Sequence, residues 1–307
     1  MLEMTTSRRT LLVAALATPL LGLLAACGDD TKSTDSTTGA TTGTTGSTGT
    51  PATTDPSLPP QAEIAHPGGA DDVILRLGYV GGFVPVGYAF TNVPTLLVSG
   101  DGRLITQAPV AAIYPGPLLP ALNVRTISEA GIQKLLQLAD TAGLLKTPPD
   151  YSGEILVADA PDTQVVISAD GATYIHQAPA LGFEERNESD ARRALAKFAE
   201  LLGDIGVVVG NENLGEDAPL VAGSYRIQAR PQTVEDLAAY DPAPTEMPWP
   251  AEIGVVLADA AECALIPAEA VSVADALFAE ATQITFFKEA DVVYQVAAVA
   301  LLPGDVC

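Results

Sequence analysis

The sequence predicts an α+β fold over residues 63–307, in which antiparallel β-sheet is packed against about three helices. Three observations lead to this prediction. The chain is 48% hydrophobic and only 17% charged, which excludes a disordered protein for most of its 307 residues. Short apolar runs separated by Gly, Pro and Asp are typical of strands joined by turns. Three longer segments repeat apolar residues at helical spacing.

The three helical segments differ in how clearly they begin and end. They are residues 129–142, 190–202 and 268–281. The first two follow a serine that can cap the helix and precede a glycine that can end it, namely Ser128, Gly143, Ser189 and Gly203. The third is less regular, because Val271 and Val273 would suit a strand as well.

Ten short segments are predicted to be strands. They are residues 72–80, 95–98, 103–106, 154–158, 163–168, 173–176, 223–230, 252–257, 284–287 and 292–300. Two pairs form hairpins, because Asp101-Gly102 and Asp170-Gly171 supply the residues that tolerate positive φ. The prolines within residues 113–120 predict an extended, unusually apolar loop after the first hairpin.

The first 27 residues have the layout of an export signal. Arg8 and Arg9 precede an apolar run over residues 11–26, and small residues lead to Cys27. The stretch Leu24-Ala25-Ala26-Cys27 resembles the lipobox of bacterial lipoproteins. This resemblance implies that residues 1–26 are removed as a signal peptide and that Cys27 carries acyl chains such as palmitate. A simple membrane anchor is the alternative, although the run is shorter than the ~20 residues that span a bilayer.

The export route has two interpretations. Arg8 and Arg9 followed by apolar residues resemble a twin-arginine export motif, but two arginines are also compatible with the general secretory route. Either route predicts an extracytoplasmic protein that is attached to the membrane through lipid on Cys27.

Residues 27–62 are predicted to form a disordered tether after the lipidated cysteine. Thr, Ser, Gly and Pro dominate this stretch, so it has no apolar face to bury. A flexible coil of this length reaches on the order of 30 Å. Residues 81–85, 100–103 and 113–120 resemble segments of uncharacterised secreted lipoproteins of actinobacterial type. The resemblance covers about residues 72–145 and part of the C-terminus, and it implies no activity.

The net charge of −23 limits the partners of the protein. Residues 63–307 keep 33 of the 38 acidic and 12 of the 15 basic side chains, which leaves a charge of −21 on the predicted folded part. Phosphate backbones repel such a body unless it has a local basic patch, and the sequence has none. Nucleic acid is therefore not an expected partner.

The sequence contains no recognisable catalytic or metal-binding motif. His66 and His176 are the two histidines, and we interpret both as surface residues because neither has a companion motif. There is no nucleophile elbow, no metal-ligand pair and no nucleotide-binding loop. The acidic run at residues 211–217 is best explained as a solvated loop. We therefore assign no catalytic residue, metal or cofactor.

Trp249 and two cysteines are the remaining residues of interest. Trp249 lies between two prolines, where it could be an exposed recognition residue or could plug the core from an irregular loop. If lipid occupies Cys27, Cys263 and Cys307 remain as a pair in an oxidising compartment. The sequence therefore predicts a disulfide between Cys263 and Cys307.

These observations favour a noncatalytic lipoprotein that binds an envelope protein, a glycan or a small molecule. Two alternatives remain. A carboxylate-dependent envelope hydrolase would bring two or more acids with raised pKa values together in a cleft. A solute-binding component of a transporter would normally have two lobes of alternating strands and helices.

Overall fold

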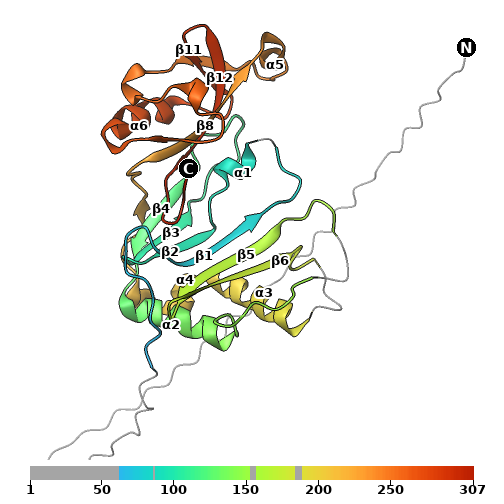
Figure 1. Cartoon of the computed structure of the whole chain (residues 1–307), viewed down its shortest axis with the longest axis vertical. Coiled ribbons are helices and arrows are strands. Elements are labelled where there is room, and N and C mark those ends of the chain that lie inside the picture. Colours follow the sequence, from blue (N-terminus) through green and yellow to red (C-terminus); the bar gives the residue numbers. More distant parts are fainter. Residues whose placement is uncertain (1–61, 86, 153–156, 184–188) are drawn as a thin grey trace, which may run out of the picture. The chain divides into compact units, whose positions relative to one another are not determined.

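The computed structural model describes residues 62–85, 87–152, 157–183 and 189–307, all within the compact unit Pro59–Cys307 (Figure 1). These residues confirm the α+β fold, with two sheets and six α-helices. Arg8, Arg9, Cys27 and the tether up to residue 61 lie outside the described residues. Among the described residues, no helix combines the length and the apolar character needed to cross a membrane.

The first sheet has seven strands in the order β6-β5-β1-β2-β3-β4-β7 (Figure 1). Every neighbouring pair in this sheet is antiparallel. The strands are β1 (Val73–Val80), β2 (Leu96–Ser99), β3 (Arg103–Gln107), β4 (Leu122–Thr126), β5 (Asp162–Ala169), β6 (Ala172–Pro179) and β7 (Ala218–Pro219).

Three helices pack against one face of the first sheet, as Figure 1 shows: α2 (Glu129–Thr141), α3 (Asp190–Leu202) and α4 (Ile205–Val209). The two long helices begin at the predicted caps, where Ser128 Oγ accepts a hydrogen bond from Gly131 N and Ser189 Oγ from Arg192 N, both at 3.2 Å. Their apolar stripes join the sheet in one core, which includes Leu135 and Phe198.

The second sheet has five strands in the order β10-β8-β12-β11-β9. They are β8 (Tyr225–Gln232), β9 (Thr245–Pro248), β10 (Ala264–Ile266), β11 (Thr285–Glu289) and β12 (Val292–Ala300). Only the β9–β11 pair among them is parallel. The predicted third helix is present as α6 (Val271–Glu280), and the 3-10 turn η4 (Ala268–Ala270) precedes it. Phe278 of α6 packs in the core of this sheet.

The two sheets meet through an apolar cluster and a polar clamp. The cluster consists of Val93, Leu97, Ile105, Leu122, Val299 and Leu302. The clamp is Asp305, whose carboxylate lies 3.0 Å from Arg76 Nη1 on β1 and 3.4 Å from Arg226 Nε on β8. A short helix, α1 (Tyr88–Thr91), adds Phe90, whose ring lies 4.8 Å from the Arg226 guanidinium.

The chain end that carries Asp305 is held by the predicted disulfide, which the structure confirms. Cys263 and Cys307 are bonded, with a Cα–Cα separation of 5.4 Å. This separation lies within the range that a disulfide spans. The bond fixes the last residue beside β10, so the C-terminal segment is covalently closed onto the second sheet.

The hairpins are also confirmed. In the β5–β6 hairpin, Asp170 (φ 51°) and Gly171 (φ 73°) form a two-residue turn with positive φ at both positions, as a type I′ turn requires. In the β2–β3 hairpin, Gly102 takes the positive φ of 79°.

Several predicted elements need correction. Residues 252–257 are not a strand. They run from the 3-10 turn η2 (Ala251–Ile253) to the start of the 3-10 turn η3 (Leu257–Asp259), because Gly254 (φ 72°) breaks the extended path. The segment before Trp249, expected to be irregular, is the edge strand β9, where proline is tolerated. The predicted strand 154–158 lies mostly outside the described residues. Strands β4, β7 and β10, the 3-10 turn η1 (Asn211–Asn213), and the helices α4 and α5 (Val234–Ala238) were not predicted.

Candidate functional site

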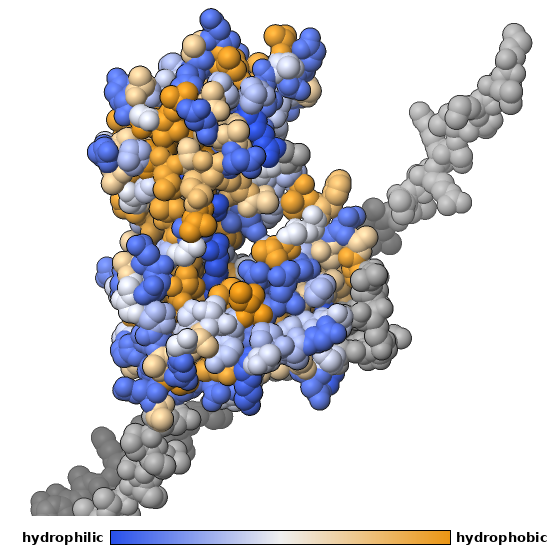
Figure 2. Space-filling model, in the orientation of Figure 1, coloured by the Kyte–Doolittle hydropathy of each residue, from blue (hydrophilic) through white to orange (hydrophobic). Residues whose placement is uncertain are grey.

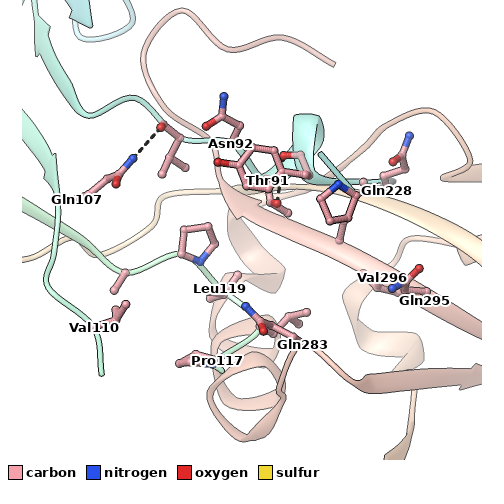
Figure 3. Close-up of a pocket in the computed structure, with 18 of the residues that line it drawn as sticks. Thr91, Asn92, Gln107, Val110, Pro117, Leu119, Gln228, Gln283, Gln295 and Val296 are labelled. Atoms are coloured by element: carbon pink, nitrogen blue, oxygen red, sulfur yellow. Dashed lines mark hydrogen bonds between the residues drawn. The ribbon is translucent and has the colours of Figure 1, made fainter. Parts of the chain in front are cut away.

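A cleft of about 560 Å³ lies where the two sheets meet (Figure 3). One wall is the outer face of β8 and β12, and the other is formed by α1, the end of β3 and the loop that precedes β4. On the face shown in Figure 2, apolar side chains gather around the junction of the sheets. The volume lies within the range of small-molecule binding sites.

The wall from the second sheet follows from strand alternation. In β8, Tyr225, Ile227 and Ala229 are buried in the core, so the residues between them face outward. The outward residues opposite each other on β8 and β12 are Gln228 with Ala297 and Arg230 with Gln295. The small side chain of Ala297 leaves room beside its long polar neighbours.

The opposite wall is apolar and is fixed by backbone hydrogen bonds. Leu118 and Leu119 lie in the predicted proline-rich loop, which cannot continue as a helix or a central strand. Gln283 N donates to Gly116 O at 2.9 Å, and Leu118 N donates to Ala281 O at 3.1 Å. These bonds attach the loop to the segment between α6 and β11. Figure 3 shows Pro117 and Leu119 beside Gln283.

Amide side chains supply most of the polar groups of the cleft. They are Asn92, Gln107, Gln228, Gln283 and Gln295. Gln107 Nε2 donates to Val93 O at 3.0 Å, the dashed line in Figure 3, and Gln228 Nε2 donates to Glu262 O at 3.2 Å. Since an amide has two donor hydrogens and one acceptor oxygen, these contacts leave hydrogen-bonding capacity for a ligand.

Arg230 is the one charged side chain among the described residues that line the cleft. Its Nη2 donates to Gln228 Oε1 at 3.3 Å, and it has no carboxylate within ion-pair distance among the described residues. Arg226, four residues earlier on the same face, is instead paired with Asp305. The cleft is therefore locally cationic within a strongly acidic chain.

His176 is not a surface residue, contrary to the interpretation of the sequence. Its side chain is 0% exposed on β6. Nε2 donates to Leu144 O at 2.8 Å, so Nδ1 is left to accept from the Tyr151 hydroxyl at 2.7 Å. Burial lowers the pKa of His176, outweighing the opposite effect of the bond to Leu144. The imidazole is thus a neutral, fully hydrogen-bonded part of the core.

His66 lies far along the chain and has different partners. Its Nε2 contacts the Glu129 carboxylate at 3.1 Å, and Nδ1 lies 2.9 Å from Pro67 O. Neither histidine lines the cleft or contacts a serine or cysteine nucleophile in the described part of the chain. The arrangement needed for nucleophilic catalysis is not formed by these residues.

Trp249 packs in the core of the second sheet, so the structure favours the packing interpretation over a role in recognition. It is 7% exposed, and its Nε1 donates to Val255 O at 2.8 Å. Its ring contacts Phe278 and Phe287. A side chain with its polar atom satisfied and its ring covered cannot meet a partner without local unfolding.

No carboxylate of the described residues has the raised pKa that is typical of a catalytic acid. Those with a perturbed pKa, namely Asp101, Glu129, Asp150, Glu212 and Asp236, all have it lowered. A hydrogen bond from Gln133 is the main cause at Glu129, and one from the Thr233 backbone is the main cause at Asp236. The described residues also form no cluster of three or more His, Cys, Asp or Glu side chains that could hold a metal ion.

No family model, curated protein or solved structure matches the chain. The cleft is the feature of the described chain that bears on function, and no motif in the sequence predicted it. Two signals in the sequence pointed to its walls: the polar residues that alternate through β8, and the apolar character of the proline-rich loop. The amides and the arginine of the cleft are typical of recognition rather than of acid–base or nucleophilic chemistry.

Proposed function

We propose that the chain is an extracytoplasmic lipoprotein that binds a small molecule in the cleft between its two sheets, without transforming it. Lipid on Cys27 would attach it to the membrane, and residues 28–62 would hold the folded body away from the surface. The cleft carries this proposal, because it combines a small-molecule volume, an apolar wall and amide side chains that have hydrogen-bonding capacity left.

The alternative of a carboxylate-dependent hydrolase receives less support. The described lining of the cleft includes no Asp or Glu, and the carboxyl pKa values that are perturbed are lowered rather than raised. A general acid needs the opposite shift. The alternative of a transporter's solute-binding component is also weaker, because the strands here pair almost entirely antiparallel, unlike a two-lobed α/β chain.

The binding function is tested by a thermal-shift screen of a chemically broad small-molecule library on the full-length chain. A ligand at about 100 times its Kd should raise Tm by on the order of 5 °C. Ala297→Phe fills the cleft and should abolish that rise, whereas Val292→Phe, on the exposed start of β12, should preserve it. Hits that stabilise wild type and Ala297→Phe equally would contradict the proposal, as would a screen without hits.

The anchor is tested separately by intact-mass measurement of membrane-extracted protein. Lipidation predicts loss of residues 1–26 and a mass increase of acyl chains on Cys27. Cys27→Ala should block processing, whereas Cys307→Ser should be processed normally. An unmodified mature chain, or normal processing of Cys27→Ala, would contradict the anchor and leave the proposal for the cleft unaffected.

A further inference from the structure

Arg230 lacks the carboxylate partner that five other arginines of the described chain have. Carboxylate oxygens lie within 4 Å of the guanidinium groups of Arg76, Arg103, Arg125, Arg193 and Arg226. Arg230 has none, although acidic side chains outnumber basic ones by 38 to 15 in the whole sequence. Acidic side chains are abundant in this protein, yet none of those described lies within ion-pair distance of Arg230.

The guanidinium is oriented rather than loose. Gln228 Nε2 is held by Glu262 O, and Gln228 Oε1 in turn accepts the hydrogen bond from Arg230 Nη2. An arginine has five N–H donors, so four remain for a ligand. Gln295 lies opposite Arg230 on β12 and adds an amide beside it. A planar guanidinium with an adjacent amide matches the two oxygens of a carboxylate.

The rest of the cleft specifies what the carboxylate would be attached to. Val110, Leu118 and Leu119 line it with apolar surface, and Figure 3 shows Val110 and Leu119 among the lining side chains. Tyr88 is the one aromatic residue among the described lining residues, which makes a poor stacking platform for a glycan. A single cation also matches a monoanion better than a phosphate or a polyanion.

We infer that the cleft binds an apolar organic monocarboxylate, with the carboxylate on Arg230 and the apolar part against the proline-rich loop. This inference rests on the proposed binding function and names the ligand class of the same site. The volume of about 560 Å³ suits a free small molecule. The carboxylate is therefore assigned to such a molecule and not to the C-terminus of a peptide.

Calorimetric titration with matched probes tests the inference. The probes are 4-phenylbutyrate, its neutral amide and the corresponding amine, titrated into the full-length chain. Wild type should bind the carboxylate at least on the order of tenfold more tightly than the amide, and the amine more weakly still. Arg230→Gln should reduce the preference for the carboxylate to within about twofold. The matched control Arg193→Gln, on the exposed face of α3, should preserve it.

The possible outcomes separate this inference from the proposal for the cleft. Equal binding of carboxylate and amide, an unchanged preference in Arg230→Gln, or no binding of any probe would overturn the inference. The Ala297→Phe screen decides independently whether the cleft binds ligands. An apolar tripeptide and its C-terminal amide are titrated as a second pair of probes. If only this pair shows tighter binding of the carboxylate form, the ligand is a peptide C-terminus and the assignment to a small molecule is wrong.

Discussion

Arg226 and Arg230 lie four residues apart on the same face of β8, yet the fold uses them in opposite ways. Arg226 is 14% exposed at its side chain, contacts the Asp305 carboxylate and lies over the Phe90 ring. Arg230 borders the cleft, and its guanidinium donates its one hydrogen bond within the described chain to Gln228. One end of the junction between the sheets is therefore closed by paired charges, and the other end is open. The same residue type thus contributes to stability at one position and is available for binding at the other.

The closed end depends on the covalent attachment of the chain terminus, and breaking it should have the largest effect. The double variant Cys263→Ser, Cys307→Ser should lose about 4 kcal/mol of unfolding free energy, since the bond joins residues separated by 44 positions. Urea denaturation measures the loss, and reduced wild type should match the variant. A loss below about 1 kcal/mol would show that the disulfide does not constrain the closed end.

The charge on Asp305 should matter next most. Asp305→Asn keeps the shape of the side chain but leaves Arg76 and Arg226 without their shared anion, which should remove about 3 kcal/mol from the unfolding free energy. The matched control is Asp217→Asn, because Asp217 pairs with Arg125 at 3.8 Å and is 43% exposed, so its loss should be below about 1 kcal/mol. Equal losses in the two variants would remove the distinction between closed and open ends.

His176, a buried polar group in the first sheet, contrasts with Arg230 in the cleft, because both of its ring nitrogens are hydrogen-bonded within the protein. Its pKa is lowered in the folded state, so the unfolded chain binds the proton first as pH falls below about 6.5. Stability is then fully present above that pH and decreases below it, by up to about 1.4 kcal/mol per pH unit.

Denaturation of wild type and His176→Gln between pH 5 and 7 checks this slope. The variant should lose the pH dependence that His176 contributes, whereas His66→Gln should retain it. The prediction fails if wild type and His176→Gln show the same slope across this range.

Local signals explain which parts of the fold could be predicted. Serine caps and glycine stops placed α2 and α3 within a residue of their observed ends, and Asp-Gly turns placed both hairpins. Short edge strands such as β7 and β10 carry little signal of their own, because their pairing partners lie far along the chain. The disulfide was predicted from chemistry, by counting the cysteines that lipidation would leave.

The exceptions show what local patterns miss. On β6, hydropathy would turn Ile175 inward and His176 outward, but Ile175 is 54% exposed and His176 is buried. The partners that satisfy His176, Tyr151 and the Leu144 carbonyl, lie 25 and 32 residues away. The cleft escaped prediction for the same reason, since it joins α1 and the end of β3 with strands more than 100 residues later.

The most direct test of the different roles of Arg226 and Arg230 is a titration with 4-phenylbutyrate, followed by the NMR signals of the arginine Nε–H groups. We expect the Arg230 signal to shift to saturation as the carboxylate binds, while the Arg226 signal stays in place because that side chain is already paired with Asp305. An unchanged Arg230 signal at saturating ligand, or a shift at Arg226 alone, would contradict the assignment of the open end of the junction as the binding site.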